Sequence, residues 1–293
     1  MGAVMKSLLV AVSGTNSDHA VLEAAYAVAA PLKAHLDFVH IPLASIEIAD
    51  FNRHVEFARG SGLDIALRET LPRSEDAKAK ARAHVRDFCA ARGIVQISQP
   101  IAIGQVTANW IACPNSPDID GFLRAARTHD LTVIGRSAGK RSWSQTLLEK
   151  LTVNSGRPIL IVPPGRARFA LDRVAVWWKD HSAAARAVTA ALPLLGAARK
   201  VSVFSILENS AETAESTEDL AKQLGWHGID ATAEILSPDH RPTIDVLWSA
   251  SLARKADIVV MGGFGRPRVQ EMIFGGCTQS VLEDGKRPVF LMH

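Results

Sequence analysis

The chain has 293 residues, of which 47% are hydrophobic and 22% are charged, and its 33 basic and 30 acidic side chains leave a formal net charge of +3. This composition is typical of a folded globular protein of about two domains and excludes a disordered chain. The charge excess is too small to indicate nucleic-acid binding, and no apolar run approaches the roughly 18 residues of a membrane span.

The N-terminal segment resembles the start of a signal peptide, but its apolar run is too short and no cleavage-like end follows it. The three cysteines, Cys89, Cys113 and Cys277, are widely spaced, and no His-x-x-x-His pair occurs. This spacing argues against a disulfide framework and against a structural zinc site. We therefore expect a cytoplasmic protein without a metal ion, a membrane partner or a nucleic-acid partner.

In chain order, the first half alternates short apolar runs with helical patterns. Strands are expected where runs rich in Leu, Val and Ile end at turn residues, and helices where apolar residues recur at helical spacing. The expected strands are 7–12, 36–41, 95–103, 131–134 and 158–162, and the expected helices are 18–32, a stretch around 75–92, 119–128 and 144–152. Strands that alternate with helices predict a mostly parallel sheet.

Pro163-Pro164-Gly165 interrupts this pattern, which then restarts. The expected strands of the second half are 173–177, 200–207, 231–236, 257–261 and 288–292, and the expected helices are 182–195, 217–224, 243–255 and one within 269–283. The amino-acid sequences of the two halves also correspond, since residues 130–135 match 257–262 and residues 157–161 match 287–291. We interpret this as an internal duplication and predict two domains, 1–164 and 165–293.

A glycine-rich turn follows the fourth strand of the second copy. In open α/β sheets, ligands bind beyond the carboxyl ends of the strands, where the strand order reverses. Main-chain N–H groups of glycine-rich turns and of helix starts can approach a phosphate closely. The residues that this spacing makes candidates for phosphate contact are Gly262, Gly265, Arg266 or Arg268, Gly275, Gly276 and Thr278. The alternative is that these glycines form only a tight turn and a close helix–strand contact.

The pattern Gly262-x-x-Gly265, nine residues, Gly275, followed by Val281-Leu282 and Pro288-Val289, resembles the universal stress protein family in its tandem form. The resemblance covers nearly the whole chain in two copies. It implies two open, five-stranded, Rossmann-like parallel sheets flanked by helices, similar to adenine nucleotide alpha hydrolases. It also implies ATP or another adenine nucleotide as ligand, with Gly262, Gly265 and Gly275 at its phosphates and ribose.

Two departures from the family pattern affect this expectation. The Ser or Thr that follows the third glycine in the family is Gly276 here, which leaves Thr278 as the nearest hydroxyl. The acidic residue that ends the family's first strand and contacts the nucleotide corresponds to Trp177 in the second copy and to Ser13 in the first. Trp177 either stacks on the base or packs into the core and closes the cleft, and core packing is favoured.

The first copy keeps the turn at 135–139, but Gln145-Thr146-Leu147-Leu148 stands where the second glycine pair should be. A leucine side chain there would block the approach of a phosphate, so we expect nucleotide binding mainly through the C-terminal domain. The turn also reads Gly-x-Ser-x-Gly around Ser137, which is the context of a hydrolase nucleophile. A triad needs a later acid and a histidine, and the candidates lie in the second copy, so we assign no catalytic residue.

The sequence therefore predicts a stress-responsive, adenine-nucleotide-binding protein that is not an enzyme, although slow ATP hydrolysis is left open. By the resemblance, strands 158–162 and 288–292 form the seam of an intramolecular pseudo-dimer, and a homodimer is left open. The alternative function is that of an interaction protein, or of a protein that binds a small apolar ligand, in which tryptophans close the clefts. Nucleotide binding by the purified protein separates the two.

Overall fold

The computed structural model describes residues 5–41, 61–100, 104–112, 119–136, 143–165, 169–207, 210–238, 240–263 and 276–293. Six strands belong to the N-terminal half: β1 (Ser7–Val12), β2 (His35–His40), β3 (Val95–Gln96), β4 (Thr107–Ile111), β5 (Leu131–Gly135) and β6 (Ile159–Val162). Five belong to the C-terminal half: β7 (Arg173–Trp177), β8 (Lys200–Ile206), β9 (Ala231–Leu236), β10 (Ile258–Gly262) and β11 (Val289–Met292).

The helices of the N-terminal half are α1 (Asp18–Leu32), α3 (Ser61–Arg92), α4 (Ile119–Thr128) and α5 (Trp143–Asn154). Those of the C-terminal half are α6 (Ser182–Ala197), α7 (Ser210–Trp226), α8 (Thr243–Ala253) and α9 (Gly276–Asp284). No helix among the described residues is both long and apolar enough to cross a bilayer.

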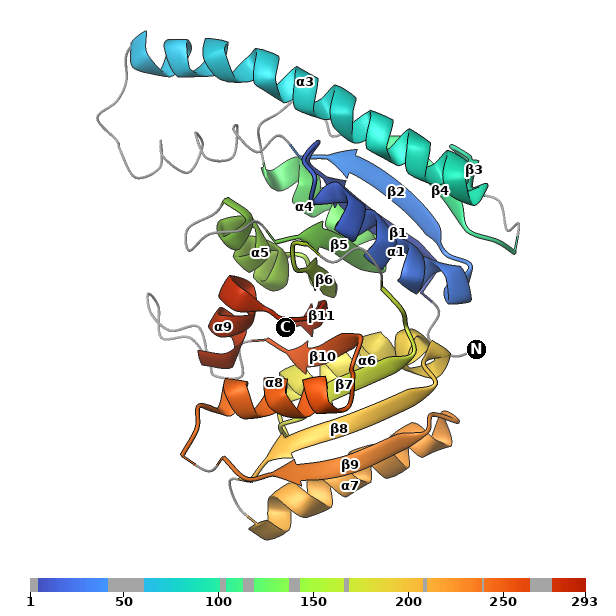
Figure 1. Ribbon diagram of the computed structural model, residues 1–293, viewed down its shortest axis with the longest axis vertical. Helices are drawn as coiled ribbons and strands as arrows, with labels where there is room; N and C mark the ends of the chain where they lie inside the picture. Colours follow the sequence, from blue (N-terminus) through green and yellow to red (C-terminus); the bar gives the residue numbers. More distant parts are fainter. Residues whose placement is uncertain are drawn as a thin grey trace.

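All described strands form one 11-stranded sheet in the order β3-β4-β2-β1-β5-β6-β11-β10-β7-β8-β9, which runs through the whole molecule (Figure 1). Its central strands are buried on both faces, so alternate residues of these strands belong to two cores. In β1, for example, Leu8 and Val10 contribute to the core under α1, α3, α6 and α7, whereas Leu9 contributes to the core under α4, α5, α8 and α9. The fold is the predicted α/β class, a mostly parallel sheet flanked by helices. The two predicted five-stranded sheets are joined into one sheet, to which the N-terminal half contributes a sixth, two-residue strand, β3.

The predicted seam between strands 158–162 and 288–292 is confirmed. β6 and β11 pair antiparallel, with Leu160 opposite Phe290 and the flanking pairs Ile159–Leu291 and Ile161–Val289 on either side. Every other strand pair in the described sheet is parallel. Because all these side chains except Ile161 are 0–1% exposed, and Ile161 is 3% exposed, the seam belongs to the core and not to a surface contact.

The outer part of the N-terminal half differs from the prediction. The expected strand 95–103 is only the two-residue β3, and the strand that pairs with β2 is β4, which the sequence pattern did not indicate. β4 lies near the sheet edge and is only partly buried, so its sequence Thr-Ala-Asn-Trp-Ile lacks the apolar run of a central strand. The helix expected around 75–92 is the end of the much longer α3. The connection before it lies outside the described residues.

A repeated carboxylate contact supports the correspondence of the two halves. Before β5, Asp130 Oδ2 accepts hydrogen bonds from the main-chain N–H of Ser7 at 3.0 Å and of the residue before it at 2.8 Å. Before β10, Asp257 Oδ2 accepts the same pair of bonds at the start of β7, from Arg173 at 3.0 Å and from the preceding residue at 3.2 Å. Each aspartate thus fixes the start of the first strand of its half.

A charged pair of side chains, Asp37 of β2 and His129 just before β5, lies in the N-terminal half. Asp37 Oδ2 lies 3.1 Å from His129 Nε2, and His129 Nδ1 lies 2.7 Å from the carbonyl oxygen of Ala125, so a charged imidazole donates both protons. Burial opposes ionisation of Asp37, but hydrogen bonds with His129 and His35 outweigh burial and hold its pKa well below the usual range. Burial also disfavours charge on His129, yet its bonds to Asp37 and Ala125 raise its pKa.

This pair predicts a pH window for its contribution to stability. The lowered pKa of Asp37 makes its contribution available above the unfolded value of about 3.9, and the raised pKa of His129 makes its contribution available below about 6.5. The difference in unfolding free energy between the wild type and His129→Gln is therefore expected to be largest between about pH 4 and 6.5. Urea unfolding at several pH values measures it, with His227→Gln, in the exposed turn after α7, as control. A difference that does not vary with pH contradicts the pairing.

The repeated aspartates give a second prediction. Asp130→Ala or Asp257→Ala leaves two main-chain N–H groups without their acceptor, so each variant is expected to lose about 1–3 kcal/mol of unfolding free energy. Asp219→Ala, which removes only an exposed ion pair with Lys222, is expected to change it by less than about 1 kcal/mol. Urea unfolding at pH 7 compares the three variants, and equal losses in all of them would show that the repeated contact is unimportant.

Candidate functional site

The strand order predicts the position of a ligand crevice, at the carboxyl ends of β7 and β10. The chain passes from β7 to β8 on one side, whereas β10 lies on the other side of β7. This is the arrangement at which ligands bind in open α/β sheets. Trp177 ends β7 and Gly262 ends β10, and the two strands are in register up to Met261 opposite Trp177. The corresponding ends in the N-terminal half are those of β1 and β5, at Val12 and Gly135.

Gly262 lies against the first turn of α6. A Cβ atom at this position would lie 2.5 Å from the main-chain nitrogen of Ala184 and 2.6 Å from the carbonyl carbon of Ala183, so no other residue fits without a shift of backbone. The next residue, Gly263, donates its N–H to the carbonyl oxygen of Met292 at 2.7 Å. The predicted turn is therefore held between α6 on one side and the end of β11 on the other.

The two helix starts near this turn differ in what they offer a ligand. His181 caps α6, and its Nδ1 accepts the N–H of Ala183 at 3.3 Å. α9 begins at Gly276, where an added Cβ would meet no atom of the described residues within 4 Å. Thr278, two residues further along the same turn, is only 4% exposed, so its side chain faces the protein interior. The open helix start at this edge is that of α9. Gly265, Arg266, Arg268 and Gly275 lie outside the described residues.

Lys179 is a residue that the sequence reasoning missed. It follows β7 by two positions, and it lies close enough to Cys277 in the first turn of α9 for its charge to act on that thiol. Burial raises the pKa of Cys277, and the charge of Lys179 opposes this rise. The charge of Lys179, just after β7, therefore acts at the first turn of α9. The sequence did offer a signal for Lys179, because it lies two residues after the first strand of the second copy, at the sheet edge where a ligand was expected.

Trp177 occupies the core beneath the crevice. The residue is 5% exposed, its indole N–H donates to Ser251 Oγ at 2.9 Å, and its ring packs edge-on against Trp248 at 4.7 Å between centroids. The neighbouring Trp178 turns to the opposite face of the sheet, where its N–H donates to Ser216 of α7 at 2.9 Å. Of the two alternatives for Trp177, these contacts correspond to packing in the core and not to stacking on a base.

The equivalent crevice of the N-terminal half is filled by the chain itself. The carboxylate of Asp18, which is 1% exposed, accepts the N–H groups of Ser13 and Gly14, each at 2.8 Å. His84 of α3 contacts the same carboxylate at 3.0 Å. Gly14 has φ +79°, and a Cβ there would lie 2.1 Å from the carbonyl oxygen of Ala77 in α3. The loop amides that could meet an anionic ligand are thus already paired, and α3 covers them.

The residue after β5 serves the seam and not a ligand. Arg136 is 9% exposed, and its guanidinium donates to the carbonyl oxygens of Glu283 and Gly285 at the end of α9. Burial lowers the pKa of Arg136, and the nearby Asp284 opposes this. A cation is well placed at the C-terminus of a helix. The first copy therefore uses this position to hold the second copy. Ser137, of the hydrolase-like pattern, lies outside the described residues.

Comparison with known proteins adds the following. No protein-family profile matches the sequence, and no curated protein sequence matches it. Among solved structures, a universal stress protein from Archaeoglobus fulgidus DSM 4304 superposes with a TM-score of 0.66 at 18% identity, over 98% of this chain and 95% of its own.

Two further structures are similar over the same length. A protein from Pseudomonas aeruginosa UCBPP-PA14, provisionally described as a universal stress protein, has a TM-score of 0.53 at 14% identity and covers 98% of this chain and 93% of its own. A functionally unknown protein from Pseudomonas aeruginosa PAO1 has a TM-score of 0.51 at 13% identity, with 98% and 92% covered. At these identities the similarity concerns the fold, and the fold of this chain is that of universal stress proteins in their tandem form.

Proposed function

We propose that this chain is a stress-responsive, cytoplasmic protein that binds ATP or another adenine nucleotide in its C-terminal domain. The observation that carries the proposal is the contrast between the two crevices. In the N-terminal half, Asp18 already accepts the loop N–H groups of Ser13 and Gly14. In the C-terminal half, the glycine turn after β10 packs tightly on α6, and the nearby α9 begins at a glycine with open space beside it.

The phosphates are the part of the nucleotide that this crevice suits best. The N-terminus of α9 carries the partial positive charge of the helix and the N–H groups of its first turn, both of which favour an anion. Lys179 adds a full positive charge near the same turn. We assign the phosphate and ribose contacts to the glycine-rich segment: Gly262, Gly265, Arg266, Gly275 and Gly276. The predicted contribution of the Thr278 hydroxyl is left out, because this residue is buried. The glycines let the main chain approach the ligand without the obstruction of a side chain.

Trp177 has a supporting role in this proposal. Its ring is buried against Trp248 and its only N–H is bonded to Ser251, so the strand end it occupies is fixed from below. A base that enters the crevice then lies above this strand end. We assign no turnover to the site, because no nucleophile with an adjacent general base is found among its described residues.

The two domains, 1–164 and 165–293, form an internal pseudo-dimer in this proposal. The antiparallel pairing of β6 with β11 joins them as two chains would be joined by their last strands. Arg136 reinforces the same contact from the N-terminal domain. Since both last strands are already paired, a further homodimer has to use another surface.

Nucleotide binding is tested by thermal unfolding and calorimetry of the purified chain with ATP, ADP and AMP. A ligand at about 100 times its Kd raises the free energy of unfolding by about 2.7 kcal/mol, so a shift in Tm is expected. Gly275→Val is expected to abolish the shift, and Gln145→Ala, at the corresponding place in the first copy, to leave it unchanged. A wild type that carries no nucleotide after purification and does not respond to millimolar nucleotide would favour the interaction-protein alternative.

Gly276 allows a gain-of-function test. A Cβ atom at this position meets no atom within 4 Å in the part of the chain that the structure describes, so Gly276→Ser is expected to fold normally. The new hydroxyl would donate a hydrogen bond to a phosphate, a charge-assisted contact of about 1.5–3 kcal/mol, and nucleotide affinity is expected to rise at least tenfold. Gly276→Ala is the matched control, with a methyl group in place of the hydroxymethyl group. Equal nucleotide affinities of the Ser and Ala variants in calorimetry would show that no phosphate lies next to residue 276.

A further inference from the structure

A small positively charged cavity lies at the opposite edge of the C-terminal half. It has a volume of about 80 Å³ and is lined by Arg173, Val174, Lys200, Ser202, Arg254 and Ala256. Arg173 and Lys200 begin the parallel strands β7 and β8, and Arg254 follows α8, so the cavity opens at the amino edge of the sheet. The crevice of the proposed function lies at the carboxyl ends of the same strands, and the inference below does not depend on it.

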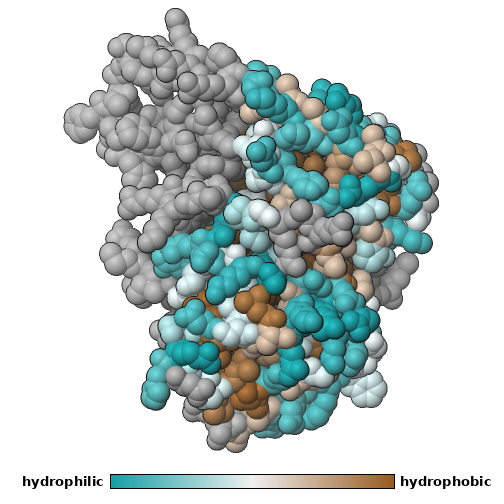
Figure 2. Space-filling view, in the orientation of Figure 1, coloured by the Kyte–Doolittle hydropathy of each residue, from teal (hydrophilic) through white to brown (hydrophobic). Residues whose placement is uncertain are grey.

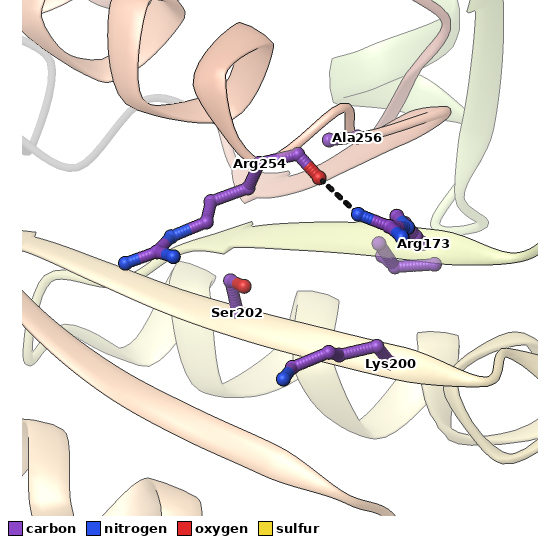
Figure 3. A pocket seen from close by; sticks show the side chains of 6 residues that line it. Arg173, Lys200, Ser202, Arg254 and Ala256 are labelled. Carbon is purple, nitrogen blue, oxygen red and sulfur yellow. Dashed lines mark hydrogen bonds between the residues drawn. The ribbon is translucent and has the colours of Figure 1, made fainter.

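Two cations of the cavity are placed side by side. Arg173 and Lys200 are in register on adjacent strands, an arrangement in which like charges destabilise a sheet. Lys200 and Ser202 are two residues apart on β8 and share one face. Figure 3 shows the Ser202 hydroxyl between the side chains of Lys200 and Arg254. The cavity therefore has cations from three elements around one hydroxyl.

The partners of these groups leave positive charge and donors available. Arg254 forms a two-bond ion pair with Glu234, at 2.8 Å for each bond, which uses one side of its guanidinium. Arg173 lies 3.8 Å from Asp172, whose carboxylate is already paired with Arg199.

The remaining two polar groups have no partner in the part of the chain that the structure describes. Neither an ion pair of the Lys200 ammonium nor a hydrogen bond of the Ser202 hydroxyl is formed there. Ser202 is 6% exposed and lines the cavity, whereas Lys200 is an exposed residue at its edge. The charge of Lys200 therefore has no anionic partner beside that of Arg173, and the hydroxyl is a donor that no described group uses. One ligand that is negatively charged and accepts hydrogen bonds would relieve the repulsion and use this donor.

We propose that this cavity binds a phosphate-type oxyanion, either as the free ion or as the end group of a small phosphate monoester. Lys200 supplies the main charge, Ser202 donates its hydroxyl proton, and Arg173 and the free side of Arg254 complete the donors. A compact tetrahedral oxyanion suits a cavity of this size better than a planar, extended ligand. Charge-assisted hydrogen bonds of this kind are stronger than neutral ones, which favours the dianion over neutral ligands.

The test is titration of the whole chain with inorganic phosphate at constant ionic strength, followed by calorimetry and by the amide NMR signals of residues 200–202. Saturable binding that shifts these signals is expected, with chloride giving no saturable response. Lys200→Gln and Ser202→Ala are each expected to weaken phosphate binding about tenfold or more, the loss of one charge-assisted bond. Lys222→Gln, on exposed α7, is the matched control and is expected to bind like the wild type.

Two further arms complete the design. Glycerol 3-phosphate in place of phosphate distinguishes the sources, because tighter binding indicates an end group and weaker binding a free ion. Gly275→Val separates this site from the nucleotide crevice and is expected to keep its phosphate affinity. Unchanged phosphate affinity in both Lys200→Gln and Ser202→Ala, or phosphate binding that the Gly275→Val variant loses, would overturn the proposal. Normal thermal unfolding of each variant in the absence of phosphate ensures that an observed loss concerns the site.

Discussion

The antiparallel pairing of β6 with β11 is the contact on which the rest of this molecule depends. It joins two halves that would each end in an exposed last strand, and an unpaired strand edge is a site of aggregation. The pairing centres on Leu160 and Phe290, which are both fully buried. It also brings the end of α9 within reach of Arg136. The start of α9 borders the proposed nucleotide crevice, so the seam helps to place the site.

The two halves share one plan and differ in what occupies the same crevice. Asp130 and Asp257 hold the start of the first strand in the same way, which is a trace of the duplication. At the other edge, Asp18 and α3 fill the crevice of the N-terminal half, whereas the C-terminal half keeps a glycine turn and an open helix start there. The proposed function assigns ligand binding to the C-terminal half and a supporting role to the N-terminal half, in accordance with this difference.

Much of the fold could be predicted from the sequence, because central strands such as β1, β5 and β10 are continuous apolar runs between turns. The close packing of Gly262 could also be predicted, because a glycine directly after an apolar strand indicates that the backbone approaches another element. In the structure this element is α6, against which only glycine fits. β4 could not, because a half-exposed strand near the edge has no apolar run.

Contacts between distant residues were also beyond the sequence. His84 meets Asp18 across 66 residues, and Arg136 meets the end of α9 across almost 150. The cation pair of Arg173 and Lys200 depends on the register of β7 with β8, which no local pattern states. Patterns with short periods thus predict elements, whereas the site is completed by side chains that the topology brings together.

The most direct measurement of the central claim is a crystal structure of the chain with a non-hydrolysable ATP analogue. The account predicts phosphate density against the main chain between the end of β10 and the first turn of α9, near Lys179, with Trp177 still in the core. An analogue bound in the N-terminal crevice, or a C-terminal crevice whose amides turn inward to protein acceptors and exclude the analogue, would contradict it.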